Sequence, residues 1–208
     1  MTTPAAAPAP TTPPATRRYD PQRRDRIIDA CLDVIAEVGV AGTSHRRVAE
    51  VADVPLGSMT YHFGGMGELL HEAFGRFAQA FSDRFTARME AAPDREAAIE
   101  AIVDAVEGDI LTDQRELVLT QELYTLAARD PSYRDLTNAW MSRSRAALER
   151  HFDPVTARML DALIEGLTLH RALDTESPQD ALARTAVHRL TAAAPNDSSP
   201  TDSPGETP

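Results

Sequence analysis

The stretch SHRRVAEVADVPLGSMTYHF, residues 44–63, decides the fold of this chain, because it predicts two short helices joined by a tight turn. We expect the first helix over residues 44–52, with the Ser44 hydroxyl accepting hydrogen bonds from free amides of the first turn. The turn falls at Asp53, a residue type that tolerates left-handed backbone geometry. We expect the second helix over residues 55–62, because the proline that opens it suits a first turn.

Apolar side chains recur in this stretch at spacings that let both helices bury one face. They are Val48, Ala49, Ala52, Val54, Met59 and Phe63. The second helix is left with an outer face of small or hydrogen-bonding groups and one phenol ring, formed by Leu56, Gly57, Ser58, Thr60, Tyr61 and His62. Such a face suits the major groove of DNA, but the pattern fits equally well a helical hairpin inside any all-helical core.

The net charge of −11 at first argues against a nucleic-acid partner, but the charge is unevenly distributed. Residues 1–65 hold seven arginines and seven acidic residues, so the whole negative excess lies in residues 66–208. A neutral N-terminal part on an acidic remainder fits a protein that touches DNA with one end only. Since the neutral part is not a basic patch, we expect weak non-specific affinity.

Arginines crowd the start of the first predicted helix, at Arg17, Arg18, Arg23, Arg24 and Arg26. They fit either a solvated helix start or an arm that meets phosphates. The hairpin that follows them in the chain favours the second interpretation.

Other function classes find little support in the sequence. Cys31 is the only cysteine and lies on the apolar side of a helix, which predicts a buried thiol. The histidines are scattered, and no nucleophile–base set or phosphate loop is recognisable, so we expect no metal, no cofactor and no enzyme activity. No apolar run is long enough to span a membrane and no signal peptide is recognisable, which predicts a cytoplasmic protein.

The pattern predicts an all-α fold between two low-complexity ends. We expect a disordered tail over residues 1–16, a DNA-binding helical domain over 17–65, a larger helical domain over 66–193 and a disordered acidic tail over 194–208. Asp-Pro and Ser-Pro pairs mark several helix starts. Besides the hairpin, helices are predicted over residues 21–38, 66–91, 94–110, 113–129, 131–152, 154–173 and 178–193.

The longer segment TSHRRVAEVADVPLGSMTYHFGGMGELL, residues 43–70, resembles the signature of the TetR family of transcriptional regulators. The resemblance implies a ligand-responsive homodimer, most often a repressor, that leaves a palindromic DNA operator when a small effector binds its C-terminal half. A module of the same fold that binds a ligand or a protein but has lost DNA binding remains open as the alternative.

The resemblance also implies roles for individual residues. Base-edge or groove-facing positions match Arg46, Leu56, Gly57, Ser58 and Tyr61, and phosphate-contacting positions match Ser44, His45, Thr60 and His62. Three positions depart from the family pattern, with Asp53 in place of glycine, Thr60 in place of tyrosine and Met66 in place of lysine. Losing the lysine should lower the affinity for DNA by about one phosphate contact.

An aromatic stripe follows the hairpin and fits either plain core or the wall of an effector cavity. The candidate cavity residues are Phe74, Phe77, Phe81, Leu123, Tyr124, Trp140 and His170. Glu122 and Glu165 could add polar groups there, although an interhelical hydrogen bond is the commoner role of such residues. The resemblance places the dimer interface on the last two helices, with candidates Leu160, Leu163, Gly166, Leu167, Leu182, Ala186 and Leu190.

Overall fold

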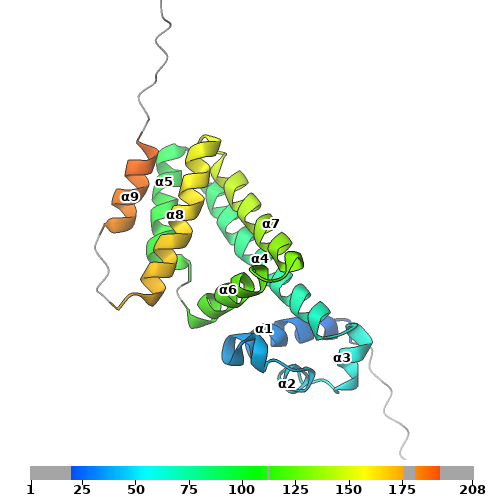
Figure 1. The fold of residues 1–208 in the computed structure, drawn as a ribbon. Helices are drawn as coiled ribbons and strands as arrows, with labels where there is room; N and C mark the ends of the chain where they lie inside the picture. Colours follow the sequence, from blue (N-terminus) through cyan, green and yellow to red (C-terminus); the bar gives the residue numbers. More distant parts are fainter. Residues whose placement is uncertain (1–19, 112, 176–180, 193–208) are drawn as a thin grey trace, which may run out of the picture.

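The computed structural model describes residues 20–111, 113–175 and 181–192, which form helices joined by short turns and contain no strand (Figure 1). The helices are α1 Arg23–Gly42, α2 His45–Val51, α3 Gly57–His62, α4 Met66–Ala91, α5 Arg95–Asp104, α6 Gln114–Ala127, α7 Pro131–Leu148, α8 Pro154–Leu173 and α9 Leu182–Thr191. The predicted all-α fold is confirmed. The tails expected over residues 1–16 and 194–208 lie outside the described residues.

Helices α1, α2 and α3 form the head of the molecule, and each boundary within it has a local cause. Gly39 adopts a φ of 71° and breaks α1 where the sequence predicts the end of the helix. The Ser44 hydroxyl accepts a hydrogen bond from the Arg47 amide at 3.4 Å and caps α2. Asp53 takes a φ of 50° in the turn to α3. The predicted hairpin is therefore present.

Helix α4 leaves the head and continues into the body, which we define as residues 66–192 (Figure 1). Its first turn is closed by Glu68, whose carboxylate accepts a hydrogen bond from the Gly64 amide at 2.6 Å. Helix α7 lies along α4, while α5, α8 and α9 pack together at the far end of the body. Helix α6 packs against α1 and α7, so both α4 and α6 connect the body to the head.

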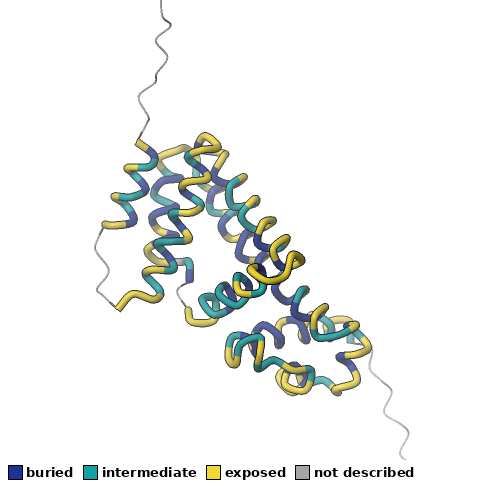
Figure 2. The backbone as a smooth tube through the Cα atoms, viewed as in Figure 1, coloured by how far each residue is buried: buried dark blue, intermediate teal, exposed yellow. Residues whose placement is uncertain are grey.

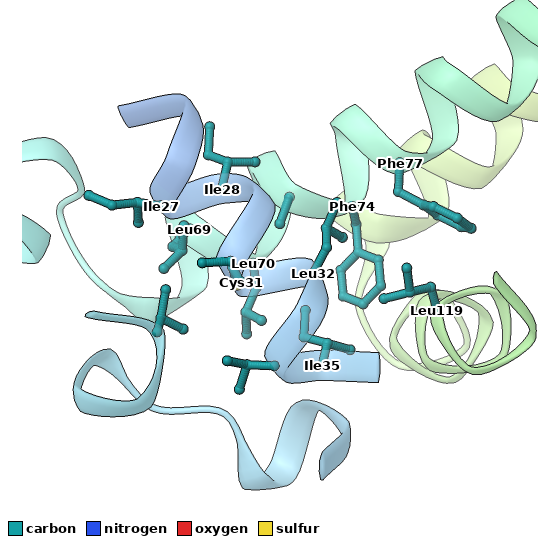
Figure 3. Close-up of a cluster of buried hydrophobic side chains, with 14 of the residues drawn as sticks. Ile27, Ile28, Cys31, Leu32, Ile35, Leu69, Leu70, Phe74, Phe77 and Leu119 are labelled. Carbon is teal, nitrogen blue, oxygen red and sulfur yellow. The ribbon is translucent and has the colours of Figure 1, made fainter. Parts of the chain in front are cut away.

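Two clusters of buried apolar side chains hold these helices together. Figure 2 marks the buried residues along the backbone. The first runs from the head into α4, α6 and α7, and Figure 3 shows Phe74 of α4 and Leu119 of α6 beside Ile35 of α1. The second joins the end of α4 to α5, α7, α8 and α9. Cys31 lies in the first cluster, where burial raises the pKa of its thiol to about 12 and makes it unreactive.

Two helices end earlier than the sequence predicts. The helix expected over residues 94–110 becomes α5 followed by a wider, π-helical turn over Ala105–Asp109. Arg171 holds this turn by donating to the carbonyls of Glu107 and Ile110. The helix expected to reach residue 152 ends at Leu148, because the Phe152 side chain is buried in the second cluster and Asp153 caps α8.

Among the described helices, none combines the length and the apolar character that a membrane crossing requires. Within the same residues, no three or more histidine, cysteine or acidic side chains gather as a metal site would require.

Candidate nucleic-acid interface and ligand cavity

Helix α3 presents an exposed aromatic ring to solvent. Tyr61 is 83% exposed, and its ring meets the His62 ring edge-on with the centroids 4.9 Å apart. Met59 anchors the other side of the helix and is fully buried, and Phe63 is buried directly after it. Three further candidate positions of this segment are exposed, namely Leu56, Gly57 and Thr60. The helix is thus held by few apolar anchors and offers most of its surface to a partner.

Ser58 is the exception on α3. It is 8% exposed, so the expectation that it faces outward is wrong. Ser58 immediately precedes the buried Met59. Because α3 has only six residues, the way its single turn packs on the head decides which positions are buried. Thr60 remains outward, with its hydroxyl donating to the Gly57 carbonyl at 3.3 Å.

Helix α2 contributes a second exposed group, the guanidinium of Arg46. It pairs with Glu50 one turn later at 3.3 Å. An exposed pair of this kind stabilises a helix by only about 0.3–0.5 kcal/mol, so a base or a phosphate can replace the carboxylate. Ser44 is exposed at the start of α2, whereas His45 is half-buried and its Nε2 atom has no hydrogen-bond partner in the described residues.

The arginines before and within the start of α1 are partly engaged inside the chain. Arg24 pairs with Glu72 of α4 and lies over the Phe63 ring, 5.1 Å from its centroid. Arg26 pairs with Asp20 at 2.5 Å. Arg17 and Arg18 lie outside the described residues. A phosphate that approached Arg24 or Arg26 would therefore compete with a carboxylate already in place.

A cavity of about 60 Å³ lies in the body between α4, α6, α7 and α8. Its wall also includes Ile110 and Leu111 from the segment before α6. The remaining lining residues are Phe81, Ser82, Phe85, Thr120, Tyr124, Trp140, Met141, Ser144, Asp161, Ile164, Glu165 and Thr168. This volume is well below the roughly 300–1,000 Å³ of sites that enclose drug-sized ligands.

Aromatic rings make up one side of the cavity. The Trp140 ring lies 4.7 Å from the Phe81 ring, centroid to centroid. Tyr124 stacks on Trp140 at 6.3 Å with an interplanar angle of 13°. These three residues, from α4, α6 and α7, belong to the candidates that the sequence suggested.

The other sequence candidates for the cavity lie elsewhere. Phe74, Phe77 and Leu123 are buried in the first apolar cluster rather than on the cavity wall. His170 is exposed on α8, because it lies on a different side of that helix from Ile164 and Thr168, which do line the cavity. The predicted cavity residues are therefore found in three places: on the cavity wall, in the apolar core and on the protein surface.

Helix α8 supplies two carboxyl groups to the cavity, Asp161 and Glu165, one turn apart. Burial raises the pKa of Asp161, although Ser144 donates a hydrogen bond to it and Arg145 pairs with it at 3.3 Å. Burial also raises the pKa of Glu165, and the nearby charge of Asp161 raises it further. Glu165 has no basic ion-pair partner in the described residues.

The Tyr124 hydroxyl forms a hydrogen bond with the Glu165 carboxylate. Burial raises the pKa of Tyr124, and the neighbouring carboxylate adds to the shift. The phenol therefore stays protonated and remains a donor.

Sequence reasoning missed Asp161 as a residue of the cavity. It shares a helix face with Ile164, Glu165 and Thr168 at steps of three and four residues, and that periodicity was the available signal.

The candidate dimer residues separate into three groups by exposure. Leu160 is fully buried within the chain, so it does not fit a role in contacting a partner. Leu182 is exposed on α9. The others are half-buried, namely Leu163, Gly166, Leu167, Ala186 and Leu190. Val155 and Met159 of α8 are also exposed, and sequence reasoning did not include them.

Comparison with known proteins supports both halves of this arrangement. A family model for bacterial regulatory proteins of the tetR family matches residues 27–73, and a tetracyclin repressor-like C-terminal domain matches residues 93–193. This chain belongs to the TetR family of transcriptional regulators. The head is therefore the family's helix-turn-helix domain, and the described part of the body from residue 93 onward is its C-terminal domain.

Individual TetR-family relatives agree over most of their length. The chain is 60% identical to the solved structure of SCO7518 from Streptomyces coelicolor A3(2), covering 83% of this chain and all of that one with a TM-score of 0.78. It is 35% identical to the multidrug binding protein EbrR in complex with ethidium, covering 81% and 98% of the two chains with a TM-score of 0.68. It is 29% identical to the regulator BetI 2 of Chromohalobacter salexigens, covering 81% and 86%.

Proposed function

We propose that this protein is a ligand-responsive repressor. Two copies bind a palindromic operator as a dimer, and an organic cation that binds the protein releases it from the DNA. The observation that carries this proposal is the presence of two separate sites on one chain, the exposed α3 and the acidic, aromatic cavity, joined by the shared helices α4 and α6. Each site has the chemistry of its proposed partner, as the following paragraphs argue.

The DNA-binding half of the proposal rests on α3 and α2. Tyr61 and Arg46 are exposed and can reach base edges or phosphates without rearranging the head. In a dimer, the two α3 helices must lie about 34–36 Å apart, or at a multiple of that spacing, to enter successive major grooves. A change in the angle between the two heads would therefore release the DNA.

The choice of an organic cation rests on the cavity wall. Glu165 is a carboxylate without a basic partner, and Trp140 and Phe81 present aromatic surface beside it. Aromatic faces and carboxylates both attract cations. EbrR, a relative of similar fold, has been solved with ethidium, with proflavin and with malachite green.

The narrowness of the cavity suggests how binding could be transmitted. A multi-ring cation does not fit a space of about 60 Å³, so its entry must displace the surrounding helices. Helix α6 carries Tyr124 on the cavity side and Glu122 toward the head, where its carboxylate accepts from the Val40 amide at 3.2 Å. Helix α4 carries Phe81 on the cavity wall and Arg76 at the head, paired with Asp29 at 2.9 Å and with Asp25.

The test is a mobility-shift titration of the purified full chain on DNA from upstream of its own gene, with malachite green as the effector. We expect a salt-sensitive, sequence-specific shift that malachite green reverses. Planar cations also bind DNA directly, so the matched control is Glu165→Gln, which should shift the same DNA but resist release. Equal release of both proteins would refute the proposed cation site.

The same titration distinguishes the proposed repressor from the alternative function. The neutral charge of residues 1–65 and Met66 at the start of α4 favour a module that binds a ligand but no DNA. That function predicts quenching of Trp140 by malachite green with no specific shift on any DNA, including sites selected from a random pool. A reporter gene under the same promoter then distinguishes repression from activation.

A further inference from the structure

The hydroxyl of Thr120 is an unusual polar group in the body. Thr120 lies on α6 and lines the cavity, it is 5% exposed, and its Oγ1 atom has no hydrogen-bond partner in the described residues. A buried hydroxyl without a partner loses its hydrogen bonds to water and gains none in return. Native proteins keep few such groups, and each one calls for an explanation.

Other buried hydroxyls of the body satisfy themselves within their own helix. Ser82 donates to the Ala78 carbonyl at 2.8 Å, and Thr168 donates to the Ile164 carbonyl at 2.8 Å. Both of these residues line the same cavity as Thr120. A hydrogen bond from the hydroxyl to a carbonyl of its own helix is therefore present on α4 and α8, but Thr120 on α6 does not form one.

The position of Thr120 relative to Glu165 sets a geometric condition on a ligand. Tyr124, which bonds to Glu165, lies one helical turn after Thr120 on α6, a rise of about 6 Å. The same cavity is lined by Thr120, Trp140 and Glu165, so a planar cation held there by Glu165 can bring a second polar group, about one ring farther along, to Thr120. An aromatic amine has such a group.

We propose that Thr120 is a specificity-determining residue of this cavity, whose hydroxyl oxygen accepts a hydrogen bond from an N–H group on an aromatic cation. The inference rests on the proposed function, because it refines the class of cation that the cavity selects. Cations with N–H donors satisfy Thr120, whereas cations whose nitrogens are fully alkylated leave the buried oxygen unpaired. The site therefore discriminates by hydrogen bonding between ligands of equal charge and similar rings.

The experiment compares proflavin, which has two primary amino groups, with acridine orange, in which the same amines are dimethylated. Binding to the DNA-free full chain is followed through the fluorescence of Trp140, the only tryptophan in the sequence. For each variant, the quantity of interest is the ratio of the two dissociation constants. This ratio cancels effects of a substitution that alter both dyes equally.

We expect the preference for proflavin to fall roughly three- to tenfold in Thr120→Val, the size of one hydrogen bond. Thr120→Ser keeps the hydroxyl and should restore the preference. The matched control is Thr137→Val, which removes a buried hydroxyl of α7 that already donates to the Arg134 carbonyl and is not part of the cavity wall, so the ratio should stay unchanged. If Thr120→Val folds, binds both dyes and keeps the wild-type ratio, the role of Thr120 is disproved. If neither dye binds the wild-type protein, the cation function itself fails instead.

Discussion

The head and the body place their polar groups in opposite ways. On α3, Tyr61 and its polar neighbours project into solvent, ready to meet a partner without rearrangement. In the body, Thr120 is buried and Tyr124 half-buried on the wall of a space too small for a multi-ring ligand, and Glu165 lines the same space while staying partly open to solvent. The difference suggests that the ligand-free chain is already competent for DNA, whereas the cavity must be opened. Under the proposed function, an effector that opens the cavity acts against the DNA-bound state.

The largest expected effect tests the exposed side of this comparison. Tyr61→Ala or Arg46→Ala should each weaken specific DNA binding by roughly 1–3 kcal/mol, because both groups can reach base edges from an exposed position. Fluorescence anisotropy with labelled operator measures the loss. Arg150→Ala, which removes an exposed arginine paired with Glu90 at 3.8 Å in the body, is the control and should change nothing. Near-zero losses at both Tyr61 and Arg46 would show that α3 and α2 are not the reading surface.

The head could be predicted from sequence because its determinants are contiguous. Ser44, Gly39 and Asp53 act on their own turns, so their residue types alone indicate the caps and the left-handed positions that the structure contains. Ser58 escaped prediction because its exposure depends on how a six-residue helix rests on the head, and neighbouring residues in the chain do not determine that.

The cavity could be predicted only in part, because its wall is assembled from four helices and a connecting segment. The aromatic stripe of α4 illustrates the difficulty. Phe74 and Phe81 share one face of the same helix, but Phe74 packs on the head and Phe81 reaches the cavity two turns later. The period of the stripe indicates which face is buried, and only the positions of α6, α7 and α8 along α4 decide what covers each ring.

The cavity side of the comparison is tested by Glu165→Gln. Replacing the carboxylate with an amide of the same shape should weaken malachite green binding about tenfold, because the attraction between the carboxylate and the positive charge of the dye is lost. DNA affinity without the ligand should be unchanged. Quenching of Trp140 measures the first quantity and anisotropy the second. A tenfold loss of DNA affinity in this variant would mean that Glu165 supports the fold of the whole chain rather than the cavity.

The same residue predicts a pH dependence. A bound cation stabilises the ionised form of Glu165, so affinity is present above the pKa of this group and is lost as the pH falls through it. Partial desolvation and the charge of Asp161 raise that pKa, so the loss should begin at a higher pH than for a glutamate with its ordinary pKa. Asp161 and Tyr124 face the same space, and Arg145 pairs with Asp161. In Glu165→Gln, the loss of affinity for the cation at the upper end of the pH range should disappear. An unchanged pH profile would assign that loss to Asp161.

The dimer surface allows a smaller but clean test at Gly166. A Cβ added there meets no atom within 4 Å in the single chain, so Gly166→Ala should stabilise α8 by about 1 kcal/mol in the absence of a partner. If Gly166 allows two copies of α8 to approach closely, the same change should raise the dimer dissociation constant. Analytical ultracentrifugation measures the dimer, with Gly57→Ala, also free of contacts, as the matched control. A more stable protein with unchanged dimerisation would place Gly166 outside the interface.

The smallest expected effect concerns the junction between head and body. Glu122 approaches the head so closely that a Cβ on Gly39 would lie 2.6 Å from its carboxylate oxygen, and that oxygen accepts from the Val40 amide. Glu122→Ala removes this link, while Glu122→Gln keeps an acceptor in place. We expect Glu122→Ala to reduce the effect of malachite green on DNA affinity by about 0.5 kcal/mol, with little change in either affinity alone. The measurement is operator affinity with and without saturating malachite green in all three proteins. Equal coupling in all three would assign the transmission to α4, where Arg76 binds Asp25 and Asp29.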